Sequence, residues 1–553
     1  MSAADRTTRS IHRISTGHPV DVVSGVLFTS CEDWTIPGRV DLEWTRIYST
    51  ALLKRPRSIL GPGWTASLLS TLRAEGSEFT FVGPEGEEDV FENFEDALEQ
   101  VETIRNLGSF QELAREDDRY IVTRWSPDSF GITRFVFSSG VPGREWPLRA
   151  IEDVTRQGID LTYDEQGRLA SVRQRREGRG FIFSYGARGR LEAVELLLAG
   201  GATGRVVTRY EYDGDGRLAA AIDAAGFADR YFYDAEGRMV REVRRNAGNY
   251  RFEFDKEGRC IETTGQDDYD RRELRYLDDQ FTTQVTDSYG SVWRYHWNVN
   301  GQVERVVSPL QAATATQFDA YGRIVRITDA IGRSASFEYD ALGNCSAVVD
   351  SRGTAQRIEF DRNRQPLIQI DEGGHPWRRS YDAQGNPATD EDPAGNRWTY
   401  VHDERGDLVE VCNPLGARKQ IRWNAQGDVI EESDWEGNLS RFEWDDEGRL
   451  VACIDALGYE TRFAYDARND IIRAAYPDGA SLRFAYDAAG NPVEVIDAAG
   501  QVTRMRYGPC GMFLEQINPD GSRSRHVWGT EPGRLLERHN ELGEVERFEY
   551  DAA

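Results

Sequence analysis

Residues 444–465 read WDDEGRLVACIDALGYETRFAY, and residues 465–486 repeat the same plan as YDARNDIIRAAYPDGASLRFAY. Each unit starts with an aromatic residue or histidine, and successive units start 21 or 22 residues apart. A fixed period of this kind is typical of a repeat array, in which each unit is stabilised by its neighbours. The units start at Tyr212, Tyr233, Phe254, Tyr276, Trp297, Phe318, Tyr339, Phe360, Tyr381, His402, Trp423, Trp444, Tyr465, Tyr486, Tyr507, Trp528 and Tyr550, with looser copies at Tyr163 and Tyr185.

Each unit contains two turn signals. The pattern Asp-x-x-Gly follows the aromatic residue, as in 445–448, and a second copy begins ten residues later, as in 455–458. Asp can bond its own backbone at the start of a turn, and Gly suits its last position. Asn469 replaces Gly in one unit, and Asn tolerates a left-handed backbone best among the other residues. Two turns per unit leave segments of strand length between them.

The segment before each aromatic residue alternates in polarity. Thr461, Phe463 and Tyr465 fall on one face and Arg462 on the other, which predicts a strand that is half buried. The fold class is therefore all-β, an antiparallel ribbon of hairpin repeats. A long flat sheet is not expected because sheets twist, so the ribbon should wind into a coil, a propeller or a hollow shell. The pattern leaves open which face would line the interior.

The first part of the chain lacks this period. We expect a leader at 1–15, flexible in solution, a β-rich pre-repeat domain at 16–155, and repeats at 156–553 that become regular from 212. Strand-like segments of the pre-repeat domain lie at 42–48, 78–82, 120–125 and 133–137, and residues 92–105 are predicted to contain a short helix.

Composition limits the partners. The chain has 553 residues, 94 acidic and 67 basic side chains and a net charge of -27, which argues against binding nucleic acid or an anionic membrane. Its 13 Trp, 23 Tyr and 24 Phe argue against a disordered chain. No apolar run approaches the roughly 20 residues of a spanning helix, and the first residues lack the apolar core of a secretory signal. The six scattered cysteines are expected to be small buried side chains.

Two groups of residues resemble a known family. The pattern Tyr-Asp-x-x-Gly-Arg-Leu occurs at 163–169 and 212–218, and at 444–450 with Trp in place of Tyr. The N-terminal part contains GHPVDVVSG at 17–25, IPG at 36–38, LEWTRIYS at 42–49 and LGPGW at 60–64. From about residue 16 onward the chain resembles the Rhs/YD-repeat family: bacterial polymorphic-toxin shells with an N-terminal pre-repeat domain, related to the Tc-toxin B/C components and to teneurins.

The resemblance implies a shell-forming scaffold. In that family the repeats spiral into a hollow β-shell that encloses a cytotoxic C-terminal domain or a guest polypeptide for delivery by type VI secretion or a similar route. The implied partners are the guest, a second chain that completes the shell, and a secretion-spike protein or adaptor. The resemblance also implies synthesis in the bacterial cytoplasm and secretion without a signal peptide. The last residues, 550–553, stop inside a repeat before any closing Asp-Pro-x-Gly-Leu motif, so we expect a fragment or one half of a shell.

We predict no catalytic, cofactor-binding or metal site, and therefore no enzyme. Residues 392–395 (Asp-Pro-Ala-Gly) resemble the start of the family's cleavage motif but stand at a regular second turn, where Asp, Pro and Gly are favoured anyway. His402 occupies an aromatic position of the repeat and is expected to pack there. The least regular stretches, 197–205 and 529–534, carry no catalytic set. The alternative hypothesis is a cell-surface adhesion or carbohydrate-binding module.

Overall fold

The computed structural model describes residues 13–55, 58–75, 78–92, 103–138 and 145–551. Within these ranges the chain is built from antiparallel strands and three short 3-10 turns, η3 (Thr50–Leu52), η4 (Gln266–Asp268) and η5 (Asp278–Gln280). In the same part of the chain, no helix is long and apolar enough to cross a membrane. The all-β hairpin ribbon predicted from the repeat is confirmed.

The N-terminal strands precede the regular ribbon. They are β1 (Ser15–Thr16), β2 (Val20–Asp21), β3 (Phe28–Ile36), β4 (Leu42–Ser49), β5 (Trp64–Ala66), β6 (Thr71–Glu75), β7 (Glu78–Val82), β8 (Glu88–Phe91), β9 (Thr103–Asn106), β10 (Gln111–Glu116), β11 (Arg119–Trp125), β12 (Ile132–Ser138) and β13 (Glu145–Glu152). Strands β3, β4 and β5 form a separate three-stranded sheet, and β6 pairs with β13.

From β13 onward each strand pairs with the next one in the chain. The first of these strands are β14 (Gly158–Tyr163), β15 (Leu169–Gln174), β16 (Gly180–Tyr185), β17 (Leu191–Leu197), β18 (Thr203–Tyr212), β19 (Leu218–Asp223), β20 (Ala228–Tyr233), β21 (Met239–Val243), β22 (Asn249–Phe254), β23 (Cys260–Thr264), β24 (Arg272–Leu277), β25 (Thr282–Thr286), β26 (Val292–Trp297) and β27 (Val303–Val307). They are followed by β28 (Ala313–Phe318), β29 (Ile324–Thr328), β30 (Ser334–Tyr339), β31 (Cys345–Asp350), β32 (Ala355–Phe360), β33 (Pro366–Ile370), β34 (Pro376–Tyr381), β35 (Pro387–Glu391), β36 (Arg397–His402), β37 (Leu408–Cys412), β38 (Arg418–Trp423) and β39 (Val429–Ser433). The last are β40 (Leu439–Trp444), β41 (Leu450–Ile454), β42 (Glu460–Tyr465), β43 (Ile471–Ala475), β44 (Ser481–Tyr486), β45 (Pro492–Ile496), β46 (Val502–Tyr507), β47 (Phe513–Ile517), β48 (Arg523–Trp528), β49 (Leu535–His539) and β50 (Val545–Arg547).

The hairpin turns have the predicted chemistry. Between β40 and β41 the backbone N–H of Asp445 donates to the Arg449 carbonyl at 3.0 Å, and the Asp445 carboxylate accepts from the Glu447 and Arg449 N–H groups. Gly448 has a φ of +82°, a left-handed conformation that an L side chain rarely adopts. Asn469 takes the equivalent position with a φ of +68°, as predicted.

The aromatic residue that starts each unit also makes a hydrogen bond. The Tyr465 hydroxyl donates to the carbonyl of Leu450 at 2.6 Å, so it ties its strand to the preceding hairpin. A polar atom at the ring's tip explains why Tyr and Trp dominate this position. The carbonyl fifteen residues earlier is bound in the same way by Tyr233, Tyr339, Tyr381, Trp423, Trp444, Tyr486, Trp528 and Tyr550.

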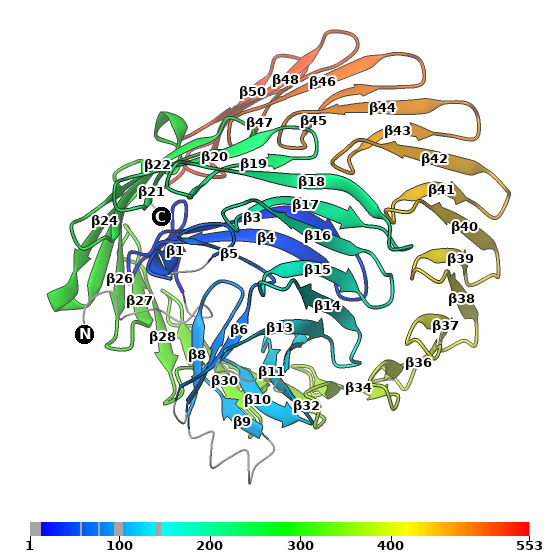
Figure 1. Ribbon diagram of the computed structural model, residues 1–553, viewed down its shortest axis with the longest axis horizontal. Helices are drawn as coiled ribbons and strands as arrows, with labels where there is room; N and C mark the ends of the chain where they lie inside the picture. Colours follow the sequence, from blue (N-terminus) through cyan, green and yellow to red (C-terminus); the bar gives the residue numbers. More distant parts are fainter. Residues whose placement is uncertain (1–12, 56–57, 76–77, 93–102, 139–144, 552–553) are drawn as a thin grey trace.

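The ribbon winds into a spiral around the small sheet of β3, β4 and β5, which we call the plug (Figure 1). We call residues 145–291 the first lap and residues 334–539 the second lap. The two laps meet along their edges, where residues about 240 positions apart in the chain make contact, such as Arg205 with Glu447. The sheet is thus a single-layered wall with the plug inside it.

Two predictions for the N-terminal part fall mostly outside the described residues. Most of the helix expected at 92–105 lies outside the described residues, and its end at 103–105 belongs to strand β9, which pairs with β10. The leader expected at 1–15 lies mostly outside the described residues as well, and Ser15 already belongs to β1. The domain boundary at 155 remains a prediction.

The cysteine prediction is correct only in part. Cys31 and Cys260 are buried, but four others are only partly buried: Cys345, Cys412, Cys453 and Cys510. All six are free thiols. Burial raises the pKa of Cys31 and Cys260, so neither side chain is poised to ionise near neutral pH.

Candidate functional site: the plug, the seam and the inner wall

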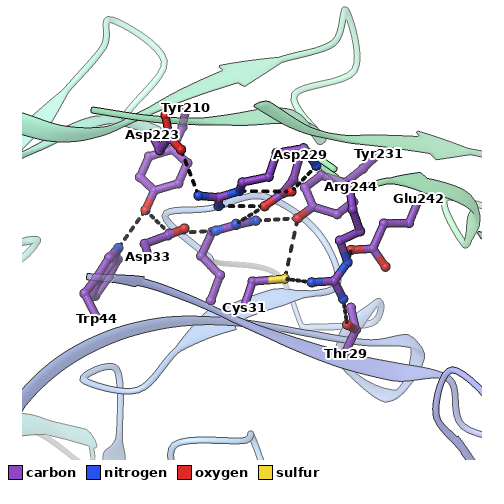
Figure 2. Close-up of polar contacts among 12 residues, drawn as sticks. Thr29, Cys31, Asp33, Trp44, Tyr210, Asp223, Asp229, Tyr231, Glu242 and Arg244 are labelled. Carbon is purple, nitrogen blue, oxygen red and sulfur yellow. Dashed lines mark hydrogen bonds and ion pairs between the residues drawn. The ribbon is translucent and has the colours of Figure 1, made fainter. Parts of the chain in front are cut away.

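A buried arginine joins the plug to the wall. Arg46 on β4 is fully buried, and its guanidinium reaches Asp33 on β3 at 2.6 Å, the Tyr231 hydroxyl on β20 at 2.6 Å and Asp229 at 3.3 Å (Figure 2). An arginine is charged at any ordinary pH, so it is tolerated here only because carboxylates compensate it. The pairing fixes the plug against strands β18 to β21 of the first lap.

Aromatic side chains extend this network. The Trp44 indole N–H donates to the Tyr210 hydroxyl at 2.7 Å, and that hydroxyl donates to Asp33 at 2.6 Å. Trp64 donates in the same way to the Tyr233 hydroxyl at 2.8 Å. These contacts hold the plug by directional hydrogen bonds as well as by burial of large rings.

A second arginine layer lies beside the first. Arg245 binds both Asp229 and Asp223, with Nη atoms 2.9 and 3.0 Å from the carboxylate oxygens. Arg244 contacts the Cys31 thiol and the Thr29 hydroxyl, each at 3.2 Å. The cluster therefore combines plug residues from β3 and β4 with wall residues that are about 200 positions later in the chain (Figure 2).

Electrostatics fix the charge state of this network. Burial opposes ionisation of Asp229, but the bonds and charges of Arg245 and Arg46 outweigh it and hold its pKa at about 2. Burial raises the pKa of the Tyr210 and Tyr231 hydroxyls well above their usual range, so both stay neutral donors. Burial lowers the pKa of the Arg46 guanidinium, but Asp33 reverses the effect and keeps that pKa high.

The two laps meet along a seam of arginine and carboxylate side chains. Arg179 binds Asp428 through both oxygens, at 2.9 and 2.6 Å, and both side chains are at least nine-tenths buried. Arg176 pairs with Asp407 one repeat earlier. Bidentate pairs of this kind are geometrically specific, so they set the register of one lap on the other.

The seam continues through the two irregular stretches of sequence. Arg205, in the first stretch, binds Glu447 and the side-chain carbonyl of Asn469. Glu531, in the second, accepts from Arg272 at 2.9 and 2.7 Å and from the backbone of Ser288 at 2.9 Å. The irregularity therefore reflects contact between laps.

A strained arginine joins the second lap to the N-terminal strands. Arg364 occupies the glycine position of its turn with a φ of +65°, which is costly for a side chain of this size. Its guanidinium is almost fully buried, stacks on the Trp125 ring at 3.5 Å and bonds Glu112 at 2.6 Å. These contacts stabilise the unfavourable backbone and lock strands β10 and β11 to the wall.

The structure shows which face of the ribbon points inward. The plug packs on the face that carries Tyr210, Tyr231 and Phe252, two residues before the aromatic residue that starts each unit, and these rings are at most 4% exposed. In the second lap, Phe463 and Phe484 occupy the same position and are only partly buried. The inner wall is therefore lined by the aromatic face, and arginine and glutamate side chains project from the outer face.

A groove runs along this wall. It has a volume of about 890 Å³ and lies between the hairpin tip at 126–131 and the inner face of strands β29 to β33, with Phe130, Ile327, Phe337 and Ile358 in its lining. Phe130 has a φ of +57° and packs against Phe360 with ring centroids 5.8 Å apart. The wall thus keeps an open apolar surface where the plug does not cover it.

The residues weighed from sequence remain ordinary parts of the repeat. Asp392 to Gly395 form a regular second turn, with the Asp392 N–H donating to the Asn396 carbonyl at 3.0 Å. His402 ends β36 in the aromatic position, where burial lowers its pKa. Across the described ranges, no three His, Cys, Asp or Glu side chains form a group that could hold a metal ion.

Sequence reasoning missed the plug network and the seam. The signal for the seam was present: the usual Arg after the turn glycine becomes Asp407 and Asp428 in consecutive repeats. The plug network had no such signal because Arg46, Asp33 and Asp229 belong to no common motif.

Comparisons with known proteins agree with this architecture. Family models match a domain of unknown function (DUF6531) at 17–91, the teneurin YD-shell at 182–325, and the RHS repeat at 318–355, 381–418, 444–481 and 486–523. No curated protein matches the chain.

Solved structures with a similar chain course include Tc toxin complexes. The TcdB2-TccC3-Cdc42 crystal structure is 13% identical over 94% of this chain and 32% of its own, with a TM-score of 0.40. The crystal structure of TcdB2-TccC3 without its hypervariable C-terminal region is 11% identical over 96% of this chain and 32% of its own, with a TM-score of 0.40. The Photorhabdus luminescens Tc holotoxin pore is 12% identical over 95% of this chain and 31% of its own, with a TM-score of 0.23. The chain spans about a third of the length of these solved chains.

The family models follow one another along the chain in the order of the plug, the first lap and the second lap. The chain belongs to the Rhs/YD-repeat family and forms a shell scaffold.

Proposed function

We propose that this chain is the wall and plug of an Rhs-type toxin shell, which encapsulates a cytotoxic C-terminal domain or partner polypeptide until delivery. The proposal rests on the inner face of the wall. In the first lap it is covered by the plug, whereas in the second lap Phe463, Phe484 and their equivalents line an interior that the described residues leave uncovered. An apolar inner wall suits a guest that exposes its own apolar residues.

The proposed action is steric and requires no catalytic residue. A continuous hydrogen-bonded wall excludes proteases, and a confined chain lacks the room to complete its fold. The seam pairs and the plug network serve this action because they keep the laps together and fill the space at the start of the spiral. We infer that the chain is not an enzyme.

Delivery remains part of the proposal. We propose synthesis in the bacterial cytoplasm and export without a signal peptide, by type VI secretion or a similar route, through a spike protein or adaptor. A second repeat chain that completes the shell is a further proposed partner.

The test uses a candidate guest, chosen as the polypeptide encoded next to this chain in its genome. The two are co-expressed, purified together and treated with a broad-specificity protease. We expect the guest to survive many times longer with the shell than alone, and to lose this protection when Arg46→Ala releases the plug. Equal digestion in both samples would refute encapsulation.

The same preparation separates the alternative function. A surface adhesion or carbohydrate-binding module should bind a glycan array saturably without any guest. Glycan binding combined with an unprotected guest would favour that alternative over the shell.

A further inference from the structure

The residue after the turn glycine differs between the laps. In the first turn of each unit this is the fifth residue, counted from the turn's first residue. Up to position 323 it is usually arginine: Arg168, Arg190, Arg217, Arg238, Arg259 and Arg323. In the second lap it is Asn344, Gln365, Asn386, Asp407, Asp428, Arg449, Asp470, Asn491 and Met512, and Arg534 follows the glycine of the longer turn after Trp528. Two of these residues, Asp407 and Asp428, lie where first turns of the second lap meet the first lap.

An arginine at this position covers its own turn. Arg168 binds the Asp164 carboxylate at 2.7 Å and stacks over Tyr185 of the next unit at 4.4 Å. Arg323 does the same with Asp319 and Tyr339. The edge of the ribbon is then lined by guanidinium groups that already have their partners.

A shorter side chain with an acceptor oxygen at the same position can receive an arginine from elsewhere in the chain. Asp407 and Asp428 accept from Arg176 and Arg179 of the first lap. The side-chain oxygen of Asn386 accepts at 2.6 Å from Arg39, in the loop between β3 and β4, so an uncharged acceptor at this position can also receive an arginine. An arginine here would face another buried arginine, which is strongly unfavourable.

One of the exceptions in the second lap supports this explanation. Arg449 keeps the self-covering arrangement, with Nε 2.7 Å from Asp445. The incoming Arg205 is received instead by Glu447, two residues earlier, and by Asn469 in the next unit. Other residues of this turn and the next one therefore act as the acceptors, and the second lap still receives the arginine.

We propose that the fifth residue of the first turn determines which repeats receive an arginine from another part of the chain: an arginine there is held by its own turn, whereas Asp or Asn accepts an incoming arginine, as at the seam. This docking rule concerns the wall alone and holds whatever the shell encloses. It assigns a specificity-determining role to a position that otherwise looks like a variable part of the repeat.

The test replaces the acceptor at this position by arginine in two adjacent repeats. In the full chain, Asp407→Arg with Asp428→Arg, the arginine variant, should open the seam. Amide hydrogen exchange in peptides over 172–180 and 403–430 should become at least about tenfold faster, since buried charge pairs are lost. Peptides over the plug strands, 28–49, should keep their protection and report that the protein is folded.

Two further variants control for charge and for folding. Asp478→Arg with Asp520→Arg makes the same charge change at two exposed second turns, away from the seam. It should leave amide hydrogen exchange at the seam unchanged. Asp407→Asn with Asp428→Asn keeps an acceptor at both positions, and should keep the seam closed. Adding Arg176→Asp and Arg179→Asp to the arginine variant should restore protection.

Each result decides the rule. Normal seam protection in the arginine variant, equal opening in the second-turn variant, or no restoration by the added aspartates would overturn it. If the arginine variant does not fold, an open seam in the asparagine variant would also overturn it, because asparagine should suffice. None of these readouts involves a guest, so they are independent of the encapsulation test.

Discussion

The two laps are built from the same repeat, yet their inner faces have different environments. In the first lap Tyr231 is 3% exposed because Arg46 and Trp64 of the plug lie directly on it. In the second lap Phe484 occupies the equivalent position of an almost identical unit and remains partly exposed. Burial in this protein is therefore set by what the ribbon encloses at each point, and the repeat alone does not determine it.

This difference divides the molecule into a stable and a permissive region. Around the plug, rings, arginines and carboxylates form one cooperative core, so local opening there should be rare. The second lap rests on hairpin hydrogen bonds, seam pairs and aromatic contacts between neighbouring strands. A wall that must accommodate a guest benefits from this arrangement, because its inner face is free of its own plug.

The largest expected effect comes from Arg46→Ala. It leaves Asp33 buried without its cation and removes one of the two arginines that bind Asp229, which should cost about 3 to 5 kcal/mol of local stability. Hydrogen exchange in β3, β4 and β18 to β21 measures it. Arg462→Ala on the outer face is the matched control and should cost less than about 1 kcal/mol. Equal effects of the two changes would contradict the proposed role of the plug.

The next largest difference in stability between the laps should come from truncating equivalent aromatic rings. Tyr231→Ala removes a fully buried ring and should cost about 3 to 5 kcal/mol. Phe484→Ala removes a partly exposed ring, so we expect about half of that or less. Urea unfolding followed by peptide-resolved hydrogen exchange would compare them. Similar losses at both sites would show that the inner faces of the two laps are packed alike.

Acid should weaken the plug through Asp229. Its folded pKa of about 2 lies below the unfolded value of about 3.9, so its stabilisation is present above pH 4 and is lost as the pH falls toward 2. The loss should amount to about 2 kcal/mol. Urea unfolding at pH 5, 4 and 3 measures it against Asp229→Asn, and the difference between the two proteins should shrink with acidity.

The seam provides an internal comparison for that titration. Burial raises the pKa of Asp407, so the folded state takes up a proton there more readily than the unfolded chain. Its contribution should therefore have the opposite sign: stability rises as the pH falls through the raised pKa and levels off below the unfolded value of about 3.9. Asp407→Asn should remove this rise; an unchanged pH profile would argue against it.

The smallest expected effect concerns the aromatic residue that starts each unit. Tyr465→Phe removes the hydrogen bond to the Leu450 carbonyl but keeps the ring, and should cost about 1 kcal/mol. The natural Phe360 shows that the fold tolerates this change at single positions. Thermal unfolding would detect it, and a series of such changes along neighbouring repeats should add up.

Much of the ribbon was predictable from the repeat. Asp445 and Gly448 specify a tight turn, and the alternation of Phe463 with Arg462 specifies a half-buried strand. These features depend on residues within one unit, so they follow from local chemistry. The predicted helix at 92–105 failed at its described end, where 103–105 pair with β10, a contact that is set by the sheet and not by the segment itself.

The sequence by itself determined the hairpin, its turns and its period, because each of these is fixed by neighbours within about 21 residues. Only the tertiary structure decided which face is the inside, where Arg46 finds its carboxylates, and which repeats meet at the seam. Those contacts join residues roughly 180 to 260 positions apart, as in Arg46 with Asp229 and Arg179 with Asp428. Their existence depends on the curvature that accumulates over a whole lap of strands, which no single repeat encodes.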